Sequence, residues 1–130
     1  MNPLRLIAFD SEDLRIVSAH VQDAVMRVAD LVPDPRSRTF TLEMNRFVWE
    51  KRRGLFDRRG ERRRSVLAIK RVTGVRSSGI DRSKGEDILN LLSVTFHRGE
   101  DPAGAIELTF SGGAAVRLEV ECIEVQLTDI

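Results

Sequence analysis

The stretch IELTFSGGAAVRLEVEC, residues 106–122, decides the fold because apolar and polar residues alternate on both sides of its central SGG. A three-residue loop at 111–113 places Leu108 opposite Val116 and Ile106 opposite Leu118, so both apolar sets share one face. A two-residue loop would shift the pairing by one and turn one set to water. Gly113 then occupies the left-handed position of the common three-residue hairpin. The stretch predicts an antiparallel hairpin, and its glycines are structural, since they lack the spacing and the following helix of a phosphate-binding loop.

Alternation continues in both directions from this hairpin. On the N-terminal side, ILNLLSVTF places Leu92, Val94 and Phe96 on one face of a strand, and RGEDPAG then forms a turn. The polar stretch 76–87 reads as a connection. On the C-terminal side, the phase of the apolar residues changes after Cys122, which predicts a bent final strand or a short helix.

The first half of the chain predicts one helix among further strands. LRLIAF reads as a strand, and Asp10 or Ser11 then caps a helix at 11–23 with acidic residues in its first turn. Its stripe is Leu14, Val17 and Val21. We favour a strand at 24–32, which forms a hairpin with the following arm through Pro33-Asp34-Pro35; continuation of the helix is the alternative.

Two later strands change phase along their length. In RTFTLEMNRFVW, three alternating apolar residues end at Met44, and Phe47 and Trp49 continue in the opposite phase, which predicts a β-bulge at Asn45 or Arg46. In SVLAIKRVTGV the phase changes near Gly74.

Together these patterns predict an α+β fold with a single antiparallel sheet of about seven strands and one helix near the N-terminus. Two arrangements fit: the sheet curls into an open barrel, as in pleckstrin-homology-like domains, or it stays one twisted sheet with the helix across one face. The 130 residues form one domain, 1–130. An exposed edge strand of such a sheet can pair with a second copy, so a homodimer is compatible with the pattern.

Composition indicates a soluble globular protein, with 42% hydrophobic and 32% charged residues. No apolar run has the 18 or so residues that a membrane span requires, so we expect no membrane partner. The N-terminal MNPLRLIAFDSED lacks the pattern of a signal peptide, and the single cysteine, Cys122, cannot form an internal disulfide. We therefore expect a cytoplasmic protein.

Catalytic and metal-binding patterns are absent from the sequence. The two histidines, His20 on the helix and His97 at a strand end, have no spacing that predicts a base beside Cys122, and we expect the first to be partly buried and the second at the surface. No Cys and His cluster predicts a metal ion or cofactor. The acids from Asp10 to Asp13 are explained by helix capping. A small enzyme with its pocket near the helix start, built on those acids or on His20, remains an alternative hypothesis.

The sequence RFVWEKRRGLFDRRGERRRS, residues 46–65, concentrates positive charge. From Lys51 to Arg64 there are eight basic residues against two acidic ones, a local charge of +6, which leaves −5 on the rest of a chain whose total is +1. A polyanion or an acidic surface would therefore bind at one place.

Our hypothesis from this asymmetry is a non-enzymatic binding or adaptor domain whose basic hairpin tip, 51–64, contacts an acidic protein partner. The alternative is nucleic-acid binding through the same tip, with Trp49 and Phe56 stacking on unpaired bases. The predicted binding residues are Lys51, Arg52, Arg53, Arg58, Arg59, Arg62, Arg63 and Arg64. Asn45, Arg46 and Trp49 are predicted to support the base of the tip, so that truncation of Trp49 reduces stability more than binding.

Three stretches, LIAFDSEDLRIVSAHVQDAV, FTLEMNRFVWE and FSGGAAVRLEVECIEVQLTDI, together resemble a family of small uncharacterised bacterial proteins known as a domain of unknown function. The resemblance runs nearly from end to end. It implies a single full-length domain in a cytoplasmic bacterial setting, and it carries over no activity, cofactor or catalytic residue.

Overall fold

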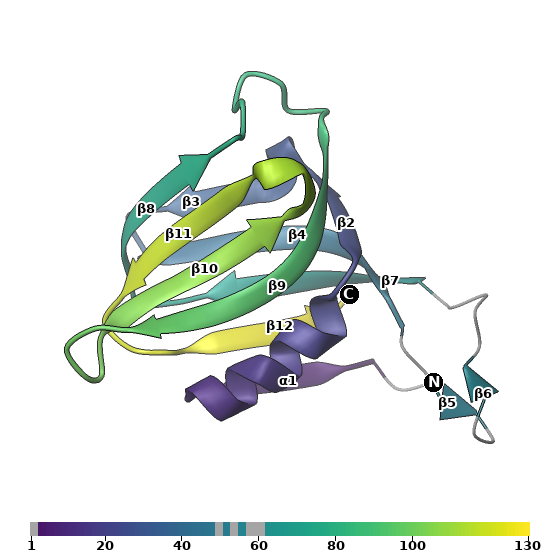
Figure 1. Ribbon diagram of the computed structural model, residues 1–130, viewed down its shortest axis with the longest axis horizontal. Coiled ribbons are helices and arrows are strands. Elements are labelled where there is room, and N and C mark those ends of the chain that lie inside the picture. The colour runs from purple at the N-terminus through teal and green to yellow at the C-terminus, as the bar shows by residue number, and fades with distance from the viewer. Residues whose placement is uncertain (1–2, 49–50, 53–54, 57–61) are drawn as a thin grey trace.

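The computed structural model describes residues 3–48, 51–52, 55–56 and 62–130 and shows one long, curled antiparallel sheet with a single helix (Figure 1). The α+β class predicted from the sequence is confirmed. The helix lies across one opening of the curled sheet, and the interior between them holds the apolar core.

The hairpin at residues 106–122 has the predicted register. In the pairing of β10 (Gly104–Phe110) with β11 (Ala115–Val120), Ile106 lies opposite Leu118 and Leu108 opposite Val116, and all four are buried. The connecting residues form a single 3-10 turn, η2 (Ser111–Gly113), in which Gly113 has φ +80° and Gly112 has φ +76°. Both glycines thus have the left-handed backbone that this short loop requires.

Ten strands form the main sheet, in the order β1-β12-β7-β4-β2-β9-β10-β11-β8, with β3 also paired to β4. The remaining elements in chain order are β1 (Arg5–Ala8), α1 (Ser11–Val21), β2 (Ala24–Arg27), η1 (Val28–Asp30), β3 (Leu31–Asp34), β4 (Thr39–Phe47), β5 (Lys51–Arg52), β6 (Leu55–Phe56), β7 (Arg62–Ile69), β8 (Val72–Ser78), β9 (Ile88–Arg98) and β12 (Val125–Asp129). Strands β5 and β6 pair separately. Every pairing in both sheets is antiparallel.

The prediction of about seven strands was wrong because three apolar runs that read as single strands are each divided. The run at 24–32, which we favoured as one strand, is β2 and β3 separated by the 3-10 turn η1. Arg71, with φ +61°, separates β7 from β8, and a bend at 121–124 separates β11 from β12. After each break the pairing changes: β2 lies between β4 and β9 whereas β3 pairs only with β4, β7 and β8 have no neighbour in common, and neither have β11 and β12.

Helix α1 matches its prediction closely. The side chain of Asp10 accepts a hydrogen bond from the Asp13 amide at 2.8 Å, which satisfies one of the unpaired N–H groups of the first turn. Leu14, Val17 and Val21 are the buried stripe, and the helix packs mainly on β9 and also on β1 and β4. It ends two residues before the predicted end, at Val21.

Two predictions of side-chain direction are corrected. The ladder between β4 and β7 is regular from Phe40 to Phe47, so the bulge at Asn45 or Arg46 is absent; the inward position after Met44 is taken by Arg46, which is buried. In β9 the register shifts beside Leu92, which is 43% exposed and so does not share the face of the buried Val94, although the alternation predicted that it would. A polar residue at an inward position and an irregular register both break simple alternation.

The curled sheet is not closed into a barrel. Its two end strands are β1 and β8, each with one neighbour in the described part of the chain. β8 comes near the outer edge of β3 rather than pairing with it, and Figure 1 shows both strands on the same side of the molecule. A hollow lies on this open side.

Candidate functional site

A groove lies between the edge strands β3 and β8. Its volume is about 430 Å³, within the range of ligand sites in proteins. The lining residues come from β3, the turn that follows it, the start of β4 and the first half of β8: Pro33, Asp34, Pro35, Arg38, Thr39, Val72, Thr73, Gly74 and Val75.

The groove is bounded at both ends by hydrogen bonds between its two walls. At one end the Val72 amide donates to the Arg38 carbonyl at 2.9 Å. At the other, the loop after β8 reaches over β3, and the Arg82 guanidinium donates to the Leu31 carbonyl at 3.5 Å, a long contact. Between these points no ladder pairing joins β3 to β8 in the described structure, so both strands present edges without strand partners.

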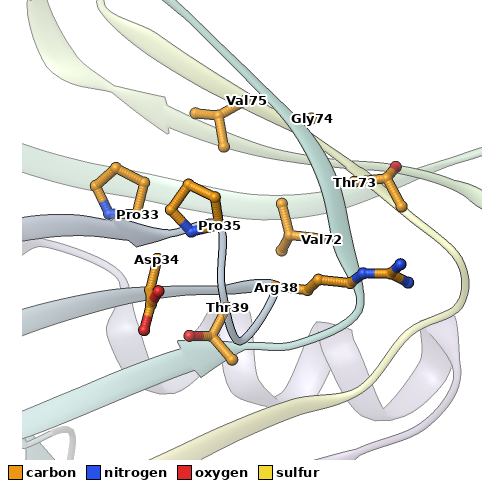
Figure 2. Close-up of a pocket in the computed structure, with 9 residues that line it drawn as sticks. All are labelled: Pro33, Asp34, Pro35, Arg38, Thr39, Val72, Thr73, Gly74 and Val75. Atoms are coloured by element: carbon orange, nitrogen blue, oxygen red, sulfur yellow. The ribbon is translucent and has the colours of Figure 1, made fainter.

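The floor of the groove is apolar. Val75 lies opposite the buried Leu118 in the β8–β11 ladder, so its side chain faces the interior, yet it is 42% exposed because β3 does not cover it. In Figure 2 the rings of Pro33 and Pro35 lie opposite Val72 and Val75. An apolar group that enters here would be removed from water on several sides.

Positive charge surrounds the groove. The bordering segments 31–39 and 70–78 carry five cations (Arg36, Arg38, Lys70, Arg71 and Arg76) against Asp34; Glu121 pairs with Arg38, and Glu124 with Lys70 and Arg71, which leaves +2. The Asp34 carboxylate accepts hydrogen bonds from the Arg36 amide and the Ser37 hydroxyl and therefore serves the turn. The local field favours an anionic ligand.

The structure places the described members of the basic segment at the end of β7. The Arg62 guanidinium lies 5.4 Å from the centre of the Phe47 ring and donates to the Asn45 carbonyl at 3.3 Å. Arg64 pairs with Glu43 at 2.9 Å. These contacts lie on the outer face of β4 and β7, away from the core, whereas Arg63 lies opposite the buried Arg46 in the ladder and is itself half-buried. The predicted set is therefore divided between two faces.

Arg46, which was predicted to support the base of the tip, is buried. Its guanidinium donates to both carboxylate oxygens of Asp129, at 2.9 and 3.0 Å, and to the Ser65 hydroxyl at 3.1 Å. The Arg46 and Asp129 side chains are 6% and 1% exposed. Asp129 also accepts hydrogen bonds from Ser65 and from the Leu4 amide. The cluster joins β4, β7 and β12 to Leu4, the residue before β1, at one end of the sheet. The support that Arg46 was predicted to give to the tip stays a prediction.

Burial raises the pKa of the Asp129 carboxyl, but hydrogen bonds from Arg46, Ser65 and Leu4 outweigh it and hold the pKa well below its usual range. His20, half-buried on α1, has a pKa lowered by burial and by the charge of Arg46, with Asp129 acting in the opposite sense. His97 is exposed. Both histidines thus have the burial that the sequence predicted.

The rest of the predicted tip falls outside what the structure describes. This applies to Trp49, Arg53, Arg58 and Arg59 and to the side chains of Lys51 and Arg52. Their role in binding, and the support from Trp49, stay predictions.

The start of α1 borders a smaller pocket of about 270 Å³. Its lining residues are Ser11, Leu14, Arg15, Val94, Thr95, Phe96 and Arg98. They include neither His20 nor the acids Asp10, Glu12 and Asp13, on which the alternative hypothesis of an enzyme was built. Within the described residues, no group of three or more His, Cys, Asp or Glu side chains is arranged to hold a metal ion.

Sequence reasoning missed the groove, because two strands far apart in the chain form it. The usable signal was Pro33 and Pro35, since proline is confined to strand edges and turns and so marks β3 as an edge. Nothing local indicated that β8 would lie opposite.

Comparison with known proteins shows which family the chain belongs to. A search of the curated proteins found no match to this chain. None of the described helices is long and apolar enough to cross a bilayer. The model of one family, described as Protein of unknown function (DUF2948), matches residues 4–130. The resemblance seen in the three sequence stretches is thereby confirmed, and the chain belongs to this family.

Proposed function

We propose that this chain is a binding domain that recognises an acidic segment of another protein in the groove between β3 and β8. The observation that carries the proposal is an apolar groove between two unpaired strand edges with a net positive border. No His, Cys or Lys is among the lining residues, and the one lining carboxylate, Asp34, accepts hydrogen bonds from its own turn and so is not placed as a base for Thr39 or Thr73; binding therefore fits the groove better than catalysis does.

The basic tip from Lys51 to Arg64 provides a second contact in this proposal. Its local charge of +6 would attract the same acidic partner and increase its rate of association. The described Arg62 and Arg64 are exposed at its base, on the outer face of the sheet.

The test is a fluorescence-anisotropy titration with a labelled peptide, Glu-Val-Glu-Val-Glu-Val. We expect the wild type to bind it and Val75→Trp, which fills the groove, to lose most of the affinity. Val32→Trp is the matched control, since Val32 is 50% exposed on β3 and is absent from the lining of the groove. Equal affinities for the wild type and Val75→Trp would reject the groove as the site.

A second titration separates the roles of the tip and of nucleic acid. A variant with Arg58, Arg59, Arg62, Arg63 and Arg64 changed to Ser should associate with the peptide more slowly, because long-range attraction is lost, while Val75→Trp should still remove most of the affinity. Single-stranded RNA is the competing probe. RNA binding that is lost in the five-Arg variant, with no binding of the peptide by the wild type, would replace the acidic protein with a nucleic acid.

A further inference from the structure

We infer that the bound segment lies extended, pairs with the free edge of β8 as an added strand, and alternates apolar with acidic residues. This inference rests on the proposed function and adds to it the mode of binding and the sequence pattern of the partner.

The free edge of β8 supplies the main-chain part of the site. Among the described strands β8 pairs only with β11, so one of its two edges has no strand beside it. Its first residue, Val72, already donates an amide hydrogen bond across the groove to Arg38. The next residues along this edge present N–H and C=O groups toward the groove, and an extended segment can satisfy them. Such added strands are a recurrent mode of peptide recognition by sheets with an open edge.

The inward side of the added strand would meet the apolar floor. Val75 faces the interior opposite Leu118, and Ser77 does so opposite Val116. Because side chains alternate between the two faces of a strand, every second residue of a segment beside β8 would enter the pocket with Pro33 and Pro35. Those residues must be apolar to match the floor, and of moderate size to fit about 430 Å³.

The outward-facing residues of the added strand would lie beside Arg76, which has no ion-pair partner among the described residues. Arg76 lies directly opposite Arg117 in the β8–β11 ladder. Arg117 is within reach of Glu107 and Glu119, whereas Arg76 has no ion pair with any residue of the described structure. An acidic residue on the other side of β8 would be a cross-strand neighbour of Arg76 and would offset the repulsion between the two arginines. The intervening residues of the segment are therefore acidic.

The walls limit the length of the pairing. β3 has four residues, from Leu31 to Asp34, and the hydrogen bonds at Val72 and Arg82 mark the two ends. At about 3.3 Å per residue, a paired stretch of about four to six residues fills the groove.

Hydrogen exchange tests the pairing. The amides of β8 between Thr73 and Ser78 that face the groove should exchange roughly tenfold or more slowly when Glu-Val-Glu-Val-Glu-Val is bound. The scrambled peptide Glu-Glu-Glu-Val-Val-Val, with the same composition, should bind more weakly and give less protection. Equal binding of both peptides with no protection of β8 would overturn the added strand, while loss of binding in Val75→Trp would still uphold the proposed function.

A charge exchange tests the alternation. Arg76→Glu should lower the affinity for Glu-Val-Glu-Val-Glu-Val about fivefold and raise the affinity for Lys-Val-Lys-Val-Lys-Val by a similar factor. The variant should fold normally, because the new carboxylate faces Arg117. The control is Arg5→Glu on β1, at the other end strand of the sheet, which should change neither affinity. If Arg76→Glu and Arg5→Glu have the same effect, only the overall charge matters and the register proposed here is wrong.

Discussion

At the scale of single residues, Arg46 is the position where chemistry departs most from pattern. It stands in a run of alternating apolar residues, at a position whose side chain must enter the core. A buried guanidinium is tolerated there because Asp129 and Ser65 satisfy it, and among the described residues no buried side-chain nitrogen or oxygen lacks a hydrogen-bond partner. The same cluster holds the two ends of the described chain together through Leu4 and Asp129.

We predict that Asp129→Leu destabilises the fold by about 3–5 kcal/mol, because it leaves the Arg46 charge buried without its partner. The double variant Arg46→Met with Asp129→Leu should recover a large part of that loss, since it removes both charges. Urea unfolding of the two single variants and the double variant measures the coupling. Strictly additive losses would mean that the pair contributes no coupling energy.

The same carboxylate predicts acid sensitivity. Its folded pKa lies below the ordinary 3.8, so its contribution to stability is complete above that value and is lost as the pH falls below it. Protonation of His20 affects stability at a higher pH than protonation of Asp129 does, because the ordinary pKa of histidine is 6.5.

For His20 we predict that the free energy of unfolding falls as the pH is lowered through 6.5, the ordinary pKa of histidine. The folded pKa is lower than this, so the unfolded chain binds the proton more readily and protonation favours unfolding. His20→Gln should lack this component between about pH 7.5 and about pH 5. Unfolding curves of both proteins across that range provide the measurement, and identical pH profiles would contradict the assignment.

At the scale of elements, close approach at one glycine shapes the β9–β10 pair. A methyl group added to Gly104 would lie 2.5 Å from the His97 carbonyl oxygen and 2.5 Å from Phe96 Cζ. The ring of Phe96 packs against the core beside this strand start, so the absence of a side chain at Gly104 is what lets the ring lie there.

We predict that Gly104→Ala destabilises the protein by about 1–3 kcal/mol through overpacking. Gly74→Ala is the matched control, because its added methyl would approach nothing closer than Glu119 Cγ at 3.7 Å. Thermal unfolding compares the two. If the two variants had equal melting temperatures, the close approach at Gly104 would carry no energetic weight.

At the scale of the whole molecule, the open side of the sheet is also a positively charged side. The groove lies where the curled sheet stays open, and its border carries the +2 that remains after ion pairing. An acidic peptide would be attracted to this border electrostatically at long range. Once it is bound, burial of its apolar residues on the floor of the groove would add to the affinity.

We predict that the affinity for the acidic peptide falls as salt rises from about 0.1 M to about 1 M and then levels off, since salt screens the charges but not apolar burial. Binding of RNA to the basic tip would instead fall log-linearly over the same range. Anisotropy titrations at several salt concentrations distinguish the two. An affinity for the peptide that does not change with salt would remove the electrostatic part of the proposal.

Whether a structural feature can be predicted from the sequence depends on whether the contacts that form it are local or long-range. Local pattern was enough for the helix with its Asp10 cap and for the hairpin whose loop places Leu108 opposite Val116. In both, the deciding contacts join residues close together in the chain. The α+β class and the antiparallel pairing follow from the same short-range signals, because short connections exclude parallel crossovers.

Tertiary structure decided the rest. The breaks at η1, Arg71 and 121–124 depend on which neighbour each half-strand pairs with, so runs that read as single strands became two. Arg46 could be placed inward only by a carboxylate 83 positions away. The groove needs β3 and β8 on opposite walls, a pairing of edges that no local propensity encodes. The sequence by itself determined the helix, the 106–122 hairpin, the α+β class and the family. Long-range packing alone determined where the strands break and the open side on which the proposed binding site lies.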